Sequence, residues 1–361
     1  MRYRMFTIAV AGAFAVFALA NLTVWKLWTQ TLLTGRYPGG DLARISYLAC
    51  FKGQRQTVHD LPRRHFELDL LREGGRRVDV LTLGDSFSAG VVGGKNPFYQ
   101  DYLASCSGLE VANAYPYQTK DAVVGASPLS NLLLFYNSGL LDRIRPRYVL
   151  LESVERFAME RFGRSCDFGL CEPADKLVQF YDGKSGAFAG YPKLSFLNAG
   201  NVKFVYYNLL YRFSDHAFKH GDNAVFLRRL KRPLFSTGGG RIIFVKKDLL
   251  SIPLATDQTM ALLNDNLNRM ADLLAQKGIT LVFMPIVDKY DLYSEEIDGN
   301  RLPRSVFFEK LRPLPKRYLF IDTKKLLREE VDQGVKDVFY PDDAHWSWKA
   351  SQKIFTTVRL R

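Results

Sequence analysis

The sequence predicts an α/β fold built on a parallel sheet, with one membrane-spanning helix before it and a cap-like insertion within it. From residue 77 onward, short apolar runs alternate with helical stretches, which is typical of a three-layer arrangement with helices on both faces of a parallel sheet. Residues 5–25 form an uncharged apolar stretch. Residues from about 158 to 255 break the alternation and are rich in Phe, Tyr, Gly and basic side chains, which indicates an insertion over the site.

The apolar runs place the strands. We expect strands at 77–83, 109–114, 147–151, 279–284 and 318–321. We expect helices at 97–107, 129–143, 257–277, 324–333 and 347–357. Thr256 is a plausible N-cap for the long helix that stops at Gly278. Ligands of such sheets bind outside the carboxyl ends of the strands. Ser86, Glu152 and Asp322 each follow a strand, so we expect them at one edge.

Three segments follow from this pattern. Residues 1–28 are expected to be the anchor, 29–76 a juxtamembrane region, and 77–361 the α/β domain with its insertion. The run Gly238-Gly239-Gly240 lacks the Lys-Ser/Thr of a phosphate-binding loop, so we interpret it as a turn or hinge.

The N-terminus indicates the compartment. Arg2 and Arg4 precede the apolar stretch 5–25, whose length as a helix matches the roughly 30 Å of a bilayer core. The arginines favour a cytoplasmic N-terminus, which places the rest of the chain outside the cytoplasm. A cleaved signal peptide ending at 18–20 is the alternative. Because the apolar character continues to Trp28, we favour a retained single-pass anchor in the inner membrane and a periplasmic domain.

Four cysteines suit an oxidising compartment. Cys166 and Cys171 are close enough in sequence for a local disulfide, whereas Cys50 and Cys106 could form a second bridge or stay free. No histidine has ligand spacing to the close pair, so we expect no metal, and no motif calls for a cofactor.

The chain is basic, with a net charge of +13 and a pI near 9.5. This charge serves solubility or attraction to an anionic surface, either phospholipid headgroups or an acidic polymer. The basic clusters belong to no nucleic-acid-binding motif, so we expect no nucleic-acid partner.

Two motifs carry chemistry. Gly84-Asp85-Ser86 directly follows an apolar run, and Asp342-Asp343-Ala344-His345-Trp346 lies near the C-terminus. A serine at a strand-to-loop corner can expose its Oγ, and a histidine preceded by a carboxylate can take the serine's proton. Each motif alone is weak evidence, but together they predict serine-dependent acyl chemistry.

These motifs resemble those of the SGNH (GDSL-type) hydrolase and acyltransferase superfamily. The chain is most similar to membrane-anchored acylation proteins, namely the alginate O-acetylation proteins and, more distantly, the D-alanyl transfer protein of teichoic acid modification. Segments 152–157 and 285–290 add to the resemblance, which spans about 78–355 and implies an SGNH-like fold.

Two departures limit the resemblance. The alginate proteins carry Asp-x-His-Trp before the serine block, whereas here it follows. The usual Gly-x-Asn-Asp block is replaced by segment 152–157, which leaves the backbone N–H of Ser86 as the one expected oxyanion donor.

Ser86 is the expected nucleophile and His345 the general base. Asp342 has the Asp-x-x-His spacing of the hydrolases and Asp343 the Asp-x-His-Trp spacing of the alginate proteins. The order of the motifs follows the hydrolases, so we favour Asp342 as the orienting carboxylate, with Asp343 as the alternative.

Five further residues are candidates for substrate binding. Glu152 and Arg156 suit a sheet-edge site or an ion pair that holds the insertion. By the resemblance, Lys289 and Tyr290 line the site. Trp346 could stack on a sugar ring or pack the loop.

The expected function is extracytoplasmic O-acyl transfer, with acetyl as the acyl group and a surface or exported polysaccharide as the acceptor. The resemblance implies a membrane-bound O-acyltransferase as the donor protein. The alternatives are a polysaccharide acetyl esterase, a membrane-tethered lipid hydrolase, and a non-catalytic SGNH-like module that binds polymer or acts as a scaffold.

Overall fold

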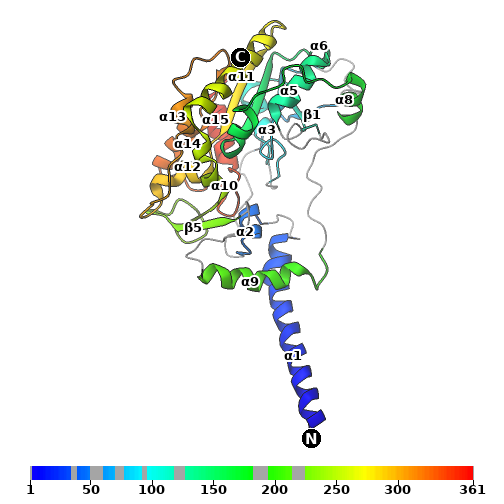
Figure 1. The fold of residues 1–361 in the computed structure, drawn as a ribbon, viewed down its shortest axis with the longest axis vertical. Helices are drawn as coiled ribbons and strands as arrows, with labels where there is room; N and C mark the ends of the chain where they lie inside the picture. The colour runs from blue at the N-terminus through cyan, green and yellow to red at the C-terminus, as the bar shows by residue number, and fades with distance from the viewer. Residues whose placement is uncertain are drawn as a thin grey trace.

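A six-stranded parallel sheet forms the centre of the domain (Figure 1). The computed structural model describes residues 2–33, 39–48, 60–69, 77–91, 96–117, 127–181, 194–213 and 224–360. The strand order is β1-β3-β2-β4-β7-β8, and every neighbouring pair is parallel. The strands are β1 (Phe66–Glu67), β2 (Val80–Leu83), β3 (Val111–Ala114), β4 (Tyr148–Val154), β7 (Thr280–Ile286) and β8 (Leu319–Phe320). The predicted α/β fold class is confirmed.

The order of the strands reverses at β2, where the sheet grows first toward β3 and then toward β4. Right-handed crossovers therefore place the helices after β2 and after β3 on opposite faces. Such a reversal opens a crevice outside the carboxyl ends of the two strands. The loop that follows β2 begins at this crevice, and it carries Ser86.

The central strands are buried on both faces, which explains their continuous apolar sequence. β4 extends farther than predicted, because its pairing with β7 runs from Tyr148 to Val154. Glu152 therefore lies inside the strand rather than just beyond it.

Two groups of helices cover the sheet. One group comprises α3 (Tyr99–Ser107), α14 (Thr323–Asp332) and α15 (Trp348–Thr357), and the other comprises α5 (Pro128–Asn137), α7 (Glu155–Phe162) and α11 (Asp257–Ala275). The Thr256 side chain accepts from the backbone N–H of Thr259, which confirms the predicted N-cap. The helix expected at 129–143 is broken at Gly139, whose φ of 78° starts the separate helix α6 (Leu140–Ile144).

The N-terminal helix α1 (Arg2–Val24) projects away from the domain (Figure 1) and continues as a π-helix, η1 (Trp25–Leu33). Residues 3–31 are long and apolar enough to cross a membrane, and an 18-residue window within them has a mean hydropathy of 2.1. Most large apolar side chains of α1 are exposed. The helix is therefore compatible with a single-pass anchor.

The segment expected to be a juxtamembrane region contributes to the domain itself. It supplies β1 to the sheet and α2 (Asp41–Ile45) to a second hydrophobic core. The second core contains Val24, Trp28, Leu42, Ala43, Leu48, Tyr207, Val225, Leu227, Ile243, Val245 and Ala344. It joins the end of the anchor to the residue immediately before His345.

The region expected to be an insertion holds α8 (Ala174–Tyr181), α9 (Ala199–Phe213), α10 (Lys247–Leu250) and an antiparallel hairpin of β5 (Val225–Arg229) and β6 (Arg241–Val245). α9 lies across the end of α1 in Figure 1, and the hairpin packs in the second core. The glycine run 238–240 ends the connection between β5 and β6 with φ of 85°, 61° and 72°, a backbone that glycine adopts readily. The division into domain and cap stays a prediction.

The predicted Cys166–Cys171 disulfide is wrong for this structure, because both are free thiols, as is Cys106. Cys50 lies outside the described residues. Asn137 holds this loop instead, since its Nδ2 donates to the carbonyls of Phe168 and Leu170 at 3.0 and 2.7 Å. These bonds fix the loop without a covalent link.

Candidate active site

The turn after β2 is fixed by the carboxylate of Asp85. Its Oδ1 accepts from the N–H of Phe87 at 3.2 Å, and its Oδ2 accepts from the N–H of Val154 at 3.1 Å and pairs with Arg161 at 2.5 Å. Burial alone would raise the pKa of Asp85, but the Arg161 guanidinium outweighs it and lowers the pKa to about 2. This ionised carboxylate holds the turn that presents Ser86.

His345 reaches this serine from the other end of the domain. Its Nε2 lies 2.7 Å from the Ser86 Oγ. The Phe87 ring lies beside the imidazole with 4.5 Å between the ring centroids. The structure therefore brings together the two motifs that the sequence singled out.

The carboxylate on the imidazole belongs to Asp343. Its Oδ1 lies 2.6 Å from His345 Nδ1 and also accepts from the His345 backbone N–H at 3.0 Å. Asp342, which the motif order favoured, instead accepts from the N–H of Gly40 at 2.8 Å. The preference for Asp342 does not match this geometry, because its side chain is bound to the N-terminal segment beside α2.

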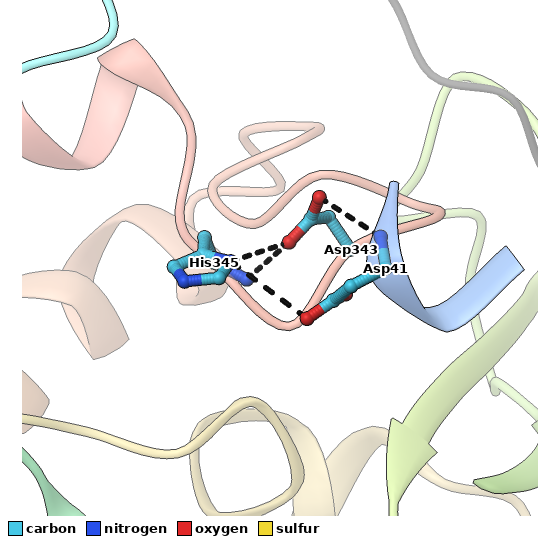
Figure 2. A group of neighbouring side chains, drawn as sticks. All are labelled: Asp41, Asp343 and His345. Carbon is cyan, nitrogen blue, oxygen red and sulfur yellow. Dashed lines mark hydrogen bonds and ion pairs between the residues drawn. The ribbon is translucent and has the colours of Figure 1, made fainter. Parts of the chain in front are cut away.

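The carboxylate of Asp41, which belongs to α2, lies next to Asp343 and His345 (Figure 2). The Asp41 N–H donates to Asp343 Oδ2 at 3.2 Å, and Asp41 Oδ1 accepts from the N–H of Ala344 at 2.8 Å. Its Oδ2 lies 3.9 Å from His345 Nδ1. Asp41 thus contacts three parts of the histidine loop, namely the carboxylate of Asp343, the backbone of Ala344 and the ring of His345.

These charges set the protonation of the site. Burial by itself lowers the pKa of His345, but the carboxylates of Asp343 and Asp41 outweigh it and raise the pKa above its usual value. Burial and the charge of Asp343 raise the pKa of Asp41 to about 6. The site therefore favours the imidazolium that forms when a serine proton is taken up.

One of the comparisons with known proteins gives a match. Residues 243–358 match a family model described as the SGNH hydrolase-like domain of acetyltransferase AlgX. The chain carries an SGNH hydrolase-like domain. No curated protein and no solved structure matches it significantly.

The matched part contains the histidine loop, whereas Ser86 and Asp41 precede the match. The resemblance to the SGNH superfamily and to the alginate O-acetylation proteins is confirmed at this level. The serine's place in the site rests on its distance to His345.

Lys289 supports the histidine loop of the SGNH-like domain from beneath. Its ammonium donates to the carbonyls of Tyr340, Pro341 and Asp343 at 2.7, 3.1 and 3.0 Å. Burial lowers the pKa of Lys289 to about 8, against the raising effect of the nearby aspartates. A side chain that is 1% exposed and bound to three carbonyls holds the loop rather than a substrate.

Glu152 and Arg156 also lie beneath the surface. Glu152 Oε2 accepts from the Ser88 hydroxyl at 2.7 Å and from the Asp85 N–H at 3.0 Å. Burial and the charge of Asp85 raise the pKa of Glu152 well above its usual range. Arg156 pairs with Asp288 at 2.6 Å and with Asp248 at 3.4 Å. The ion-pair interpretation of Arg156 fits these contacts, and a substrate-binding role for either residue does not.

Tyr290 and Trp346 are buried as well. The Tyr290 hydroxyl donates to the carbonyl of Pro303 at 2.9 Å. Trp346 packs edge-on against Phe87 at 5.3 Å and is 5% exposed. All five residues expected to bind substrate are therefore buried and held by partners within the protein.

Asp41 is the residue that sequence reasoning missed. It lies 302 residues before Asp343 and resembles an ordinary first-turn acidic residue of a short helix. Asp41, Asp343 and His345 also place ligand atoms within 4.8 Å of one another. An ion there would have to displace the 2.6 Å contact between Asp343 and the ring nitrogen, so the set fits a carboxylate–histidine pair better than a metal site.

Gly84→Ala tests the packing under the serine turn. A Cβ at Gly84 would overlap the Ser88 hydroxyl and the Glu152 carboxyl. We expect a loss of about 1–3 kcal/mol in the free energy of unfolding, measured by chemical denaturation, because overpacking forces neighbours to shift. Gly12→Ala, where a Cβ meets no atom within 4 Å, is the control. Equal stability of the two variants would contradict this account.

Proposed function

We propose that the protein is an extracytoplasmic, serine-dependent O-acyltransferase that moves an acetyl group to a hydroxyl of a cell-surface or exported polysaccharide. The observation that carries the proposal is the chain of contacts from Ser86 to His345 and from His345 to Asp343, at 2.7 and 2.6 Å. The match to a domain described as belonging to an acetyltransferase supports acetyl as the group.

In the first half-reaction, the Ser86 Oγ attacks the carbonyl carbon of the donor ester or thioester. His345 Nε2 takes the hydroxyl proton and then gives it to the leaving group as the donor's bond breaks. Asp343 keeps the remaining ring proton on Nδ1 and stabilises the imidazolium. The backbone N–H of Ser86 is the oxyanion donor in this proposal.

In the second half-reaction, a sugar hydroxyl attacks the acyl-serine. His345 takes the hydroxyl proton and returns it to Ser86 Oγ as the acyl–serine bond breaks. Water in place of the sugar would make the protein an acetyl esterase. The apolar helix α1 supports transfer, because an anchor would hold Ser86 beside a membrane-bound acyl donor protein.

The location and the partners belong to the same proposal. Arg4 before the apolar span supports a cytoplasmic N-terminus and a periplasmic domain. The net charge of +13 supports attraction to an acidic polymer or to anionic lipid headgroups.

Ser86→Ala and His345→Ala test the nucleophile and the base. Members of such a pair act as a unit, so each variant should lose up to about 10⁶-fold in kcat, and the double variant should be little worse. The assay is turnover of p-nitrophenyl acetate with and without an acetyl-accepting oligosaccharide, together with a mass-spectrometric search for acetyl on Ser86. Ser236→Ala, at an exposed site, is the control. Wild-type turnover by Ser86→Ala would overturn the proposal.

Asp343→Asn and Asp342→Asn test the orienting carboxylate. Loss of the Asp343 charge should cost about 10⁴-fold in kcat, because the imidazole loses its tautomer and its counter-ion. Asp342→Asn leaves the ring's partner in place and should cost far less. A raised pKa keeps His345 protonated up to a higher pH, so Asp343→Asn should move the acid limb of kcat/KM to lower pH. A larger loss in Asp342→Asn would contradict the assignment.

Asp41 is a positioning residue in this proposal, and two variants separate its charge from its hydrogen bond. Asp41→Asn keeps an acceptor for the Ala344 N–H, whereas Asp41→Ala removes it. Since Asp343 and Asp41 raise the pKa of His345 and burial and Arg156 lower it, both variants should move the acid limb of kcat/KM to lower pH. Only Asp41→Ala should also lose about tenfold or more in kcat. An unmoved acid limb in both variants would show that Asp41 acts on the fold alone.

A further inference from the structure

The helix α9 carries an apolar face that points away from the protein. The face consists of Val202, Val205, Tyr206, Leu209 and Phe213. Each of these residues lies three or four positions from another of them, which places them on one side of a helix. Leu209 is 53% exposed and Phe213 is 85% exposed. Next to the helix, Phe196 and Leu197 extend the exposed apolar surface.

Polar side chains hold the opposite face of α9. Asn201 Nδ2 donates to Asn21 Oδ1 at 2.9 Å, and the Thr29 hydroxyl donates to Asn201 Oδ1 at 2.6 Å. Asn208 Nδ2 donates to the carbonyl of Tyr47 at 3.0 Å. A surface helix of a soluble protein normally turns its apolar side inward. The inner side of α9 also packs Tyr207 in the second core, so the helix is apolar on both sides, and the buried amide contacts fix which side faces outward.

These contacts attach α9 to the place where the apolar helix ends. Asn21 and Thr29 both belong to the continuous helix of α1 and η1. A Cβ at Gly200 would lie 2.7 Å from Trp28, so the two helices cross closely. Figure 1 shows α9 running across the axis of α1 at the base of the domain.

We propose that α9 lies in the headgroup region of a phospholipid bilayer, parallel to its surface, with the apolar face against the acyl chains. α9 crosses α1 at the domain end of the apolar span, and both helices expose large apolar side chains, so a bilayer around α1 meets α9 at the end of the span. Trp25 packs against Phe196 at this level, a position typical of aromatic side chains at a membrane interface.

Charge at the same level suits an anionic bilayer. Lys26 follows the apolar span and Lys203 flanks the apolar face of α9, and both are exposed. Helices of this kind combine burial of apolar area with attraction of their cations to anionic lipids. The surface of a bilayer around α1 must lie where the apolar span ends, which is the level of α9. A second protein chain would have no reason to bind at that level.

The proposal also assigns an orientation to the catalytic domain. The inner face of α9 contributes Tyr207 to the second core, which also contains Ala344. Tyr47, from the segment after α2, stacks on both Trp28 and Tyr207 with centroids 4.5 and 4.8 Å apart. α1 alone would leave the domain free to tilt. α9 gives the domain a second contact with the bilayer, so the orientation of the domain, and of Ser86 in it, is fixed relative to the membrane plane.

The test uses the full-length chain in vesicles of phosphatidylethanolamine and phosphatidylglycerol. The native cysteines are replaced by serine, and a single cysteine is placed at Leu209 and labelled with an environment-sensitive fluorophore. We expect blue-shifted emission and strong quenching by lipids with a spin label near the headgroup. The same label at Gln276, an exposed residue at the end of α11, should show water-like emission without quenching.

A pair of double variants, labelled at Phe213, sharpens the result. Val205→Asp with Leu209→Asp should abolish the quenching, whereas Val205→Leu with Leu209→Val should keep it. Flotation with the vesicles reports on α1 separately and should be unchanged in both. Water-like emission at 209 in protein that floats would overturn the proposal. An apolar signal at 209 without lipid quenching, together with crosslinking to a second copy, would show that protein covers the face instead.

Discussion

The hydrogen bonds between the start of α2 and the Asp342–Asp343 pair are the contacts on which the candidate site depends. The N–H groups of Gly40 and Asp41 donate to the two carboxylates, and the N–H of Ala43 donates to the carbonyl of Asp342. Both carboxylates are nearly fully buried, so the loss of these donors would weaken the compensation of two buried charges. The same contacts orient His345 toward Ser86.

Lys289 holds the same loop from its other side. Its ammonium satisfies three carbonyls on the inner side of the loop that α2 binds from outside. Such a loop has little freedom, because its backbone is held by charged and polar donors in a region of low dielectric. A catalytic imidazole benefits from this rigidity, since a small displacement would break its contact with the serine.

The sequence was sufficient for the parts of the molecule that local patterns encode. Buried parallel strands produce continuous apolar runs, so the main strands and the residue that follows β2 could be predicted. The roles of Glu152, Arg156 and Lys289 could not, because a charged residue after a strand is equally compatible with a surface site and with a buried ion pair. Local spacing could not separate Asp342 from Asp343, since the choice depends on donors from α2. Asp41 had no local signal at all, because its partners are about 300 residues away in the sequence.

The contact between Gly40 and Asp342 has a consequence for how the protein is made. It joins residues 302 positions apart, and the serine lies between them in the sequence. On a ribosome, α2 and the serine turn emerge long before the histidine loop, and domains fold as units only when their elements are present. The nascent chain therefore carries Ser86 without its histidine partner until the histidine loop has emerged. The contact between Ser86 and His345 forms only when this late segment of the domain docks against an early one.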